Sequence, residues 1–236
     1  MTPIRFVCAT RLSAAEFETG CALGRSLALY RSQFGALFQT RLFAENAEGL
    51  PTVYNRAIDE SDNHPALLVF IHDDVWLTDL FWPSRFHEAL TQFDLVGVAG
   101  SRRRLPGQLS WGLVRKTEGS IGWDDREYLS GCVAHGPRTE TPVIQSVGHF
   151  GPARVEVKLL DGVLMLAHSQ TLIQRGLRFD PRFDFHFYDL DLCRQAEQIG
   201  LRMGTWDLSL IHCSEGSFQD PRWLTAYQTY LQKWGT

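Results

Sequence analysis

A short apolar run that ends in acidic residues constrains the fold of this chain more than any other segment. Leu67–Ile71 are five consecutive apolar residues, and His72, Asp73 and Asp74 follow them directly. A strand that is apolar on both faces is typical of the inside of a parallel sheet. Open α/β sheets bind ligands beyond the carboxyl ends of such strands, where an acidic pair can hold a divalent metal and, through it, phosphates.

Apolar runs alternate with helical patterns along most of the chain, which predicts an α/β fold with a mostly parallel central sheet and flanking helices. Ser101–Pro152 interrupts this alternation, and its richness in Gly, Pro and Arg predicts a loop-rich insertion. The 236 residues contain no repeat or linker, so we expect a single domain. The expected strands are Ile4–Ala9, Phe34–Phe43, Leu67–Ile71, Leu95–Ala99, Val155–Leu160, Val163–Ala167 and Leu208–Ile211, and the expected helices are Ser13–Ser32, Val53–Ile58, Phe86–Phe93, Asp189–Gly200 and Pro221–Trp234.

Composition narrows the classes of function. A net charge of -4 argues against a dedicated nucleic-acid binder, and we interpret the basic run Arg102–Arg104 as a solvated loop, with a phosphate contact as the alternative. Five scattered cysteines without a Cys-x-x-Cys pair are typical of a reduced, intracellular protein. Without a signal peptide or an apolar run of bilayer length, we expect a cytoplasmic protein, and contact with the inner face of a membrane stays open.

Several polar groups fall where strands end or a helix begins. His72, Asp73 and Asp74 follow one expected strand, and His212 follows the last one. Asp74 and His212 could share one cation, because carboxylate and imidazole both suit Mn²⁺ and carboxylate suits Mg²⁺. Taken alone, the acidic pair could be a turn and His212 a partly buried histidine, so the functional interpretation depends on the whole set.

A second dense segment contains two aspartates at the start of an expected helix. Asp189 and Asp191 are two residues apart and cannot share one helix face. A carboxylate at a helix N-terminus tends to stay ionised, as a general base must, although a simple N-cap is an equally ordinary role for Asp189. His186 lies among aromatic residues, which favours packing or substrate shaping over metal binding.

In their order, these motifs resemble the GT-A-fold glycosyltransferases of the family 2 type, and within them the StrF-domain subgroup related to streptomycin biosynthesis. Four segments carry the resemblance: Gly49–Ile58, Val69–Val75 as the equivalent of the DxD motif, Leu160–Gly162, and Phe179–Gly200 as the segment of the catalytic base. His72 departs from the pattern at the first DxD position. Tyr188 departs from it where the family has a glutamate before the aspartate.

The resemblance implies a metal-dependent, inverting transfer of a sugar from a UDP- or GDP-type donor, with Mn²⁺ or Mg²⁺ as cofactor. It assigns Asp74 and His212 to the metal and Asp189 to the acceptor proton, with residues 1–100 forming the donor half and 101–236 the acceptor half. It further implies donor contacts from Thr10, Arg11, Asn46, Asn55, His72 and Asp73, and acceptor contacts from Asp161, Gly162, Trp111, His186 and Asp191.

Alternatives remain at this point. A metal-dependent phosphohydrolase or nuclease would use similar residues, but phosphohydrolases with a His-Asp pair place it on helices, and here it follows a strand. A non-catalytic glycan-binding scaffold of the same fold is the third hypothesis. The acceptor could be a glycan, a lipid-linked molecule or a small molecule. The aromatic segment Trp223–Trp234 could pack on the core, close the site, join subunits of a homo-oligomer or lie on a membrane.

Overall fold

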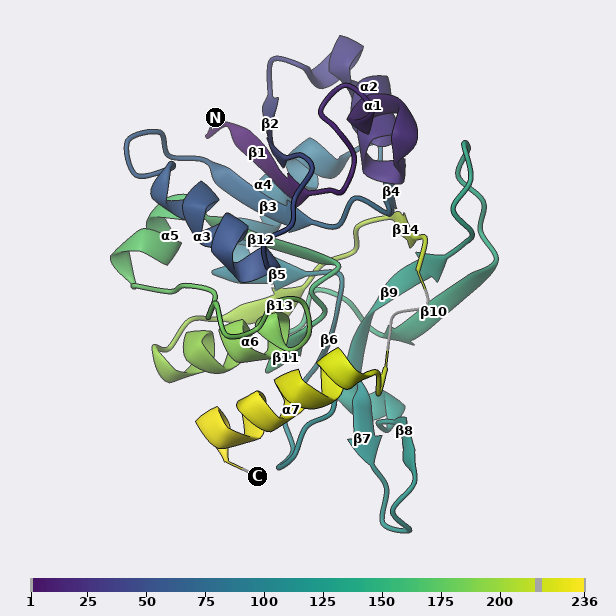
Figure 1. Cartoon of the computed structure of the whole chain (residues 1–236), viewed down its shortest axis with the longest axis vertical. Coiled ribbons are helices and arrows are strands. Elements are labelled where there is room, and N and C mark those ends of the chain that lie inside the picture. The colour runs from purple at the N-terminus through teal and green to yellow at the C-terminus, as the bar shows by residue number, and fades with distance from the viewer. Residues whose placement is uncertain (1, 215–217, 236) are drawn as a thin grey trace.

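A mostly parallel sheet forms the centre of the molecule. The computed structural model describes residues 2–214 and 218–235. Of the six central strands, five run in one direction and β12 runs against them, so the expected mostly parallel sheet is confirmed (Figure 1). In spatial order the strands are β13 (Met203–Thr205), β5 (Leu95–Gly97), β12 (Leu164–His168), β3 (Leu67–Ile71), β1 (Ile4–Ala9) and β2 (Phe38–Phe43).

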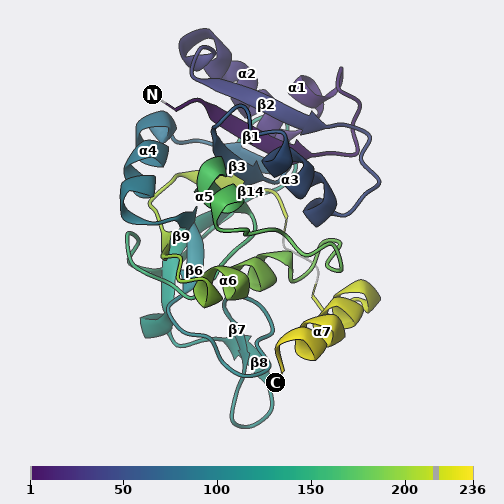
Figure 2. The ribbon, with the colours of Figure 1, turned by 90° about the vertical axis from the view of Figure 1, so that its left-hand side faces the viewer.

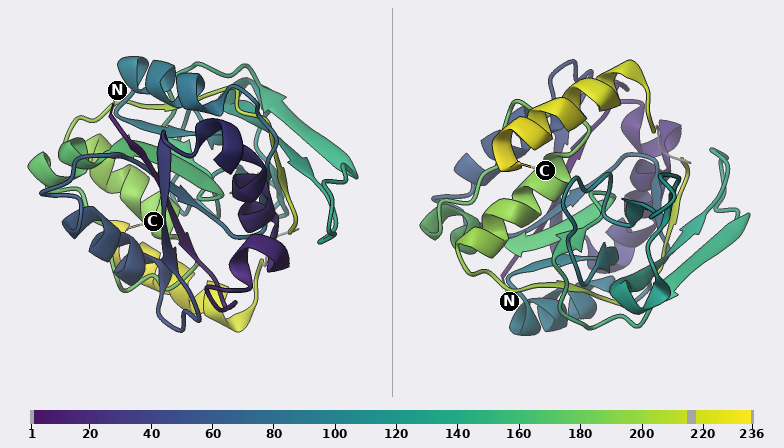
Figure 3. Two further views of the ribbon diagram at one scale, coloured as in Figure 1. Left: turned by 90° about the horizontal axis from the view of Figure 1, so that it is seen from above. Right: turned by 90° about the horizontal axis from the view of Figure 1, so that it is seen from below.

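Helices cover both faces of this sheet, which is why β3 is apolar throughout and fully buried. On one face, Tyr54 packs against Phe70 with ring centroids 4.9 Å apart, and on the other Phe6 packs against Trp82 at 5.1 Å. Figure 3 shows α3 (Leu50–Asp59), α5 (Ser169–Gln174) and α6 (Tyr188–Gln198) on one side and α2 (Ala22–Phe34) and α4 (Trp82–Gln92) on the other, and a short α1 (Phe17–Gly20) precedes α2.

A second sheet packs beside the first and takes its two longest strands from the segment 101–152. Its strand order is β11 (Leu159–Leu160), β6 (Ala99–Ser101), β9 (Leu129–His135), β14 (Leu210–His212) and β4 (Val75–Leu77), and β10 (Ser146–Gly151) pairs with β9. Figure 1 shows the β9–β10 hairpin projecting from the body of the molecule. A smaller hairpin, β7 (Leu113–Arg115) and β8 (Ile121–Trp123), and the turn η1 (Arg126–Tyr128) lie in the same segment.

Several boundaries differ from the expected ones because short strands carry little periodic signal. The segment 101–152 is richer in strands than the expected loop-rich insertion. The apolar run Leu95–Ala99 divides at Val98 between β5 of the first sheet and β6 of the second. The expected helix Ser13–Ser32 is interrupted at Cys21, and Phe34 ends α2 instead of starting a strand.

The C-terminal helix α7 (Pro221–Trp234) matches its expected bounds. It begins with Asp220, whose side chain accepts a hydrogen bond from the Trp223 backbone N–H, and with Pro221, which is preorganised for a first helical turn. Figures 1 and 2 show α7 beside α6 at the lower end of the molecule. Within the described residues, none of the helices has both the length and the apolar character that a membrane crossing requires.

Candidate active site

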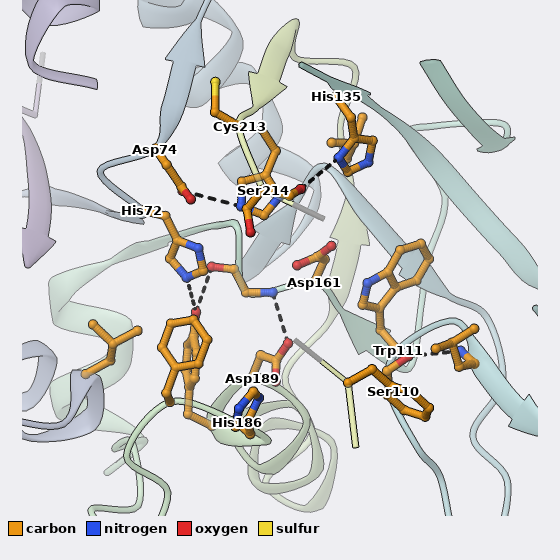
Figure 4. Close-up of a pocket in the computed structure, with 18 of the residues that line it drawn as sticks. His72, Asp74, Ser110, Trp111, His135, Asp161, His186, Asp189, Cys213 and Ser214 are labelled. Atoms are coloured by element: carbon orange, nitrogen blue, oxygen red, sulfur yellow. Dashed lines mark hydrogen bonds and ion pairs between the residues drawn. The ribbon is translucent and has the colours of Figure 1, made fainter. Parts of the chain in front are cut away.

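The candidate site is a cavity of about 1180 Å³ between the end of β3, the start of α6 and the β9–β10 hairpin. Sites for single small ligands commonly measure about 300–1,000 Å³, so this cavity has room for two reactants. Figure 4 shows His72 and Asp74 on one side, Asp189 on α6 below them and Trp111 across the cavity. Asp161 lies between these groups.

Three side chains converge on a candidate cation site. Single donor atoms of His72, Asp74 and His212 lie within 4.8 Å of one another. His72 and Asp74 follow β3, whereas His212 ends β14, and its backbone pairs antiparallel with Val75 directly after Asp74. We expected the ends of parallel strands in one sheet to bring these residues together. Instead, the antiparallel pairing of β14 with β4 in the second sheet brings His212 beside Asp74.

The buried ring of His212 fits a metal ligand. Its Nε2 atom lies 3.4 Å from Oδ1 of Asp74, yet neither this contact nor any other in the described part of the chain has the geometry of a hydrogen bond to that nitrogen. Buried polar atoms without partners are rare in folded proteins, and a cation held between these two atoms would satisfy both. Two imidazoles and one carboxylate suit Mn²⁺ better than Mg²⁺, which prefers oxygen ligands.

The electrostatics keep the carboxylate of this site charged. Burial alone would raise the pKa of Asp74, but the close contact with His212 and the charges of His212, His72 and Arg138 outweigh it and lower that pKa to about 2. Burial lowers the pKa of His72, which favours its neutral, metal-binding form. For His212, the effect of burial is overcome by Asp74, and its pKa is raised.

A chain of hydrogen bonds orients the ring of His72. The Tyr188 hydroxyl donates to the carbonyl oxygen of Gly162 at 2.9 Å and lies 2.9 Å from Nε2 of His72. Because a tyrosine has one hydroxyl proton, Tyr188 must accept the hydrogen bond from His72, which therefore carries its proton on Nε2. The lone pair on Nδ1 is then available as a metal ligand, so the site includes His72, whose role the sequence pattern left open.

Gly162 connects this chain to the candidate base. Its backbone N–H donates to Oδ2 of Asp189 at 3.0 Å, while Oδ1 of Asp189 accepts the Leu190 N–H at 2.9 Å. A Cβ atom at position 162 would lie 2.3 Å from the Tyr188 hydroxyl oxygen, so the close approach requires glycine. The Asp-Gly pair of the sequence is thereby explained by packing against the start of α6.

Asp189 has the properties of a general base. Protein atoms enclose its carboxylate on most sides, but part of its surface opens into the cavity. Burial, and then the negative charge of Asp161, raise the pKa of Asp189 to about 7, against the lowering effect of the backbone N–H groups. A base with a pKa near the working pH combines a populated ionised form with the ability to accept a proton.

The other candidate, Asp191, does not reach the cavity. It is fully buried, and its Oδ1 accepts hydrogen bonds from the Trp234 indole N–H at 2.7 Å and pairs with the Lys233 ammonium at 2.6 Å. Its Oδ2 accepts a hydrogen bond from Gln195. Its carboxylate is therefore engaged in joining α6 to α7, and Asp191, which we expected to contact the acceptor, does not line the cavity.

The remaining predicted site residues divide into two groups. Asp161, Gly162, Trp111 and His186 line the cavity, as does Asp73, which accepts a hydrogen bond from the Thr10 hydroxyl at 2.7 Å. Four others do not line it: Thr10, Arg11, Asn46 and Asn55. Of these, Asn55 both donates to and accepts from the backbone of Phe179 and so has a structural role, whereas Asn46 bonds to the Thr10 carbonyl through its backbone N–H.

Sequence reasoning missed several residues of the cavity. Arg138 and His135 come from the β9–β10 hairpin, and Trp123 and Phe150 pack with Trp111 into an aromatic wall, in which Phe150 meets Trp111 at 4.8 Å. Their sequence signal is weak because each lies in or beside a short strand of the segment 101–152. The glycines and prolines around them gave no motif that could be placed.

Comparisons with known proteins agree with this fold. A family model described as "Glycosyltransferase like family" matches residues 41–232. Among solved structures, the chain is similar to a crystal structure of GalNAc-T7 with UDP, GalNAc and Mn²⁺, with 10% identity and a TM-score of 0.54 over 99% of this chain and 48% of that chain. The chain thus spans about half the length of that protein, and the similarity shows a shared GT-A fold.

Two further solved structures are similar at lower scores. A197 from STIV has 10% identity and a TM-score of 0.44, over 87% of this chain and 82% of that chain. TarS from S. aureus has 9% identity and a TM-score of 0.44, over 90% of this chain and 37% of that chain. No curated protein matches the sequence.

Proposed function

The chain belongs to the glycosyltransferase-like family, and from this premise we propose that it transfers a sugar from a nucleotide-diphosphate sugar to an acceptor hydroxyl in a metal-dependent, inverting reaction. One observation carries the proposal. A candidate cation site of His72, Asp74 and His212 shares a cavity with Asp189, a carboxylate whose pKa is raised to about 7.

The donor side of the cavity follows from the residues after β3. His72, Asp74 and His212 would hold Mn²⁺ or Mg²⁺, and when bound such a cation neutralises negative charge on the leaving diphosphate. Asp73 lies beside Asp74 and is fixed by the Thr10 hydroxyl, so it would contact the donor's ribose or sugar. The GalNAc-T7 structure contains UDP and Mn²⁺, which supports the same donor class here.

The reaction follows from the position of Asp189 beside the cavity. Its carboxylate takes the proton of the acceptor hydroxyl as that oxygen attacks the anomeric carbon of the donor. The bond between the anomeric carbon and the diphosphate oxygen breaks, and its electron pair leaves with the diphosphate. Because attack and departure occur on opposite faces of the carbon, the configuration inverts. Positioned base catalysis of this kind contributes about 10²–10⁴-fold to a rate.

The acceptor would lie against the wall formed by Trp111, Trp123 and Phe150. Trp123 is 51% exposed, so one of its faces is available to a ligand. Asp161 and His186 also line the cavity and would contribute polar contacts. An aromatic wall with nearby polar groups suits an acceptor that has both apolar ring faces and hydroxyl groups.

Ligand-induced stabilisation tests the proposed donor class. Melting temperatures are measured with UDP and with GDP, each with and without Mn²⁺. At a nucleotide concentration of about 100 times Kd we expect about 2.7 kcal/mol of stabilisation. That corresponds to a rise of roughly 5–10 °C for a chain of this size. The rise should require Mn²⁺ and should be lost in Asp74→Asn. Absence of stabilisation by either nucleotide would count against a nucleotide-sugar donor.

A further inference from the structure

The charges around the cavity are unbalanced for a diphosphate ligand. Among the residues that the structure describes, four aspartates line the cavity: Asp73, Asp74, Asp161 and Asp189. Arg138 contributes the one arginine or lysine side chain in that lining. A nucleotide diphosphate adds further negative charge, so one divalent cation alone leaves the occupied cavity strongly negative. Arg138 is therefore the one permanently charged cation in the described lining that can supply additional positive charge.

Arg138 is already held next to the candidate cation site. It lies in the loop between β9 and β10, and its Nη2 donates to Oδ2 of Asp74 at 2.9 Å while its Nε lies 3.3 Å from the Cys213 carbonyl oxygen. The other carboxylate oxygen of Asp74, Oδ1, faces His212. Asp74 can thus orient the guanidinium with one oxygen and serve the cation site with the other.

We propose that Arg138 binds the diphosphate of the donor directly, beside the metal; this inference rests on the proposed function. Within the described residues, Nη1 of Arg138 has no hydrogen-bond partner, and 71% of the side chain is exposed. A guanidinium anchored through Nε and Nη2 presents its remaining N–H groups in a fixed plane, a geometry that suits two phosphate oxygens. The same charge would stabilise the diphosphate as it leaves the sugar.

A purely structural role for the Arg138–Asp74 pair would mean that the loss of Arg138 lowers the stability of the fold. We expect the melting temperature to stay nearly unchanged instead, because ion pairs with one largely exposed partner contribute little to stability. If instead Arg138 acts by holding Asp74 in place for the metal, its loss should weaken binding of Mn²⁺ alone. A diphosphate ligand role predicts a loss that is confined to phosphate-bearing ligands.

The experiment compares the full chain with Arg138→Gln and Arg138→Lys, and with Arg25→Gln as a matched control. Arg25 donates to the carbonyl oxygen of Thr139 in the same loop but does not line the cavity. Binding of Mn²⁺ alone is measured by electron paramagnetic resonance. Binding of UDP, GDP and the corresponding free nucleosides in the presence of Mn²⁺ is measured by calorimetry and, for the weak nucleosides, by NMR titration.

We expect Arg138→Gln to weaken binding of the preferred nucleotide diphosphate by about 10- to 100-fold, as for the loss of charge-assisted hydrogen bonds. Arg138→Lys should recover part of this loss, and Arg25→Gln should bind like the wild type. Nucleoside and Mn²⁺ affinities should change less than about threefold.

Three results would overturn the assignment. They are an unchanged diphosphate affinity in Arg138→Gln, an equal loss for nucleoside and diphosphate, or a loss of Mn²⁺ affinity of the same size. A wild-type protein that binds neither UDP nor GDP would contradict the proposed function itself and this inference with it. If the wild type binds UDP or GDP and Arg138→Gln binds the same nucleotide equally tightly, only the role of Arg138 is contradicted and the proposed function stands.

Discussion

At the scale of single residues, the orientation of the His72 ring depends on Tyr188. The Tyr188 hydroxyl accepts from Nε2 of His72 and donates to the Gly162 carbonyl, so removal of this hydroxyl leaves the histidine tautomer unfixed. Groups that orient metal-binding histidines typically change metal affinity by about 10–100-fold when they are removed. Tyr188 therefore orients a side chain of the candidate cation site.

We predict that Tyr188→Phe weakens Mn²⁺ binding by about 10–100-fold, as measured by electron paramagnetic resonance. Tyr54→Phe is a matched control, because Tyr54 is also a buried tyrosine that packs against Tyr188, but its hydroxyl has no hydrogen-bond partner in the described structure. It should bind Mn²⁺ like the wild type. Equal Mn²⁺ affinity in the wild type and Tyr188→Phe would show that His72 does not depend on this contact.

The raised pKa of Asp189 predicts the pH dependence of transfer. Below pH 7 the carboxyl is mostly protonated and cannot accept the acceptor proton, so kcat/KM should rise with pH through about 7 and level off above it. Asp189→Asn should lower kcat by about 10²–10⁴-fold and retain nucleotide binding. A break near pH 4 would mean that the base lies in a more polar environment than that of Asp189.

Asp191→Asn is the informative contrast for that experiment. Because Asp191 is buried against Lys233 and Trp234 and away from the cavity, its replacement should lower stability and leave the pH profile of transfer unchanged. A shift of the profile in Asp191→Asn, with a normal profile in Asp189→Asn, would exchange the two assignments.

The sequence alone predicted some of these site residues but not others, and the difference has a physical reason. Asp74, His212 and Asp189 each adjoin an apolar run or a periodic helix, so their positions at element ends could be predicted. The role of His72 depends on a hydrogen bond to Tyr188, which is 116 residues away, and that of Arg138 depends on a bond to Asp74 across 64 residues. Such contacts leave no local pattern.

At the scale of elements, α7 stabilises the start of α6. Phe187, which precedes α6, has a left-handed backbone with φ of 65°, a strained conformation for a bulky residue. Its ring packs against Trp223 and Tyr230 of α7, with centroids 5.2 Å and 5.3 Å away. Because Asp189 lies two residues later, α7 helps to fix the position of the candidate base.

The contribution of α7 to stability can be measured by removing the ion pairs of Lys233. Lys233→Met removes the cation that lies 2.6 Å from Asp191 and 2.7 Å from Asp180, and leaves a fully buried carboxylate with neutral partners. We expect a loss of about 3 kcal/mol in the free energy of unfolding, measured with urea. Lys116→Met, which breaks a far more exposed pair, should cost less than about 1 kcal/mol. Equal small losses in both variants would show that α7 is not anchored through Asp191.

Long periodic elements could be predicted, whereas short strands could not. The apolar spacing indicated α3, α6 and α7, and the apolar runs indicated β1 and β3. Strands of three residues such as β4 and β14 are too short for a reliable pattern, and the pairing of His212 with Val75 depends on the register between them. The convergence of His212 on Asp74 was therefore expected, but the route by which the chain achieves it was not.

At the scale of the whole molecule, two sheets and α6 meet around one cavity that contains the candidate cation site and the candidate base. The GT-A fold explains why the two lie together, since β3 and the start of β12 meet at one edge of the central sheet with Ile71 opposite Leu164. His72 directly follows β3 at that edge, and Asp161 and Gly162 lie just before β12. The Gly162 N–H in turn donates to Asp189, which places the candidate base beside the candidate cation site. Chemistry at the cation site and at Asp189 can therefore act on one pair of substrates.

The most direct test of the proposed function is release of nucleoside diphosphate from a panel of nucleotide sugars, measured with Mn²⁺ for the wild type and for Asp74→Asn. We predict that at least one donor is turned over by the wild type, slowly to water and faster with an acceptor. This release should stop when Mn²⁺ is chelated, and it should be lost in Asp74→Asn. Turnover that Asp74→Asn retains in full, or no turnover of any donor by a protein that binds Mn²⁺, would contradict the account.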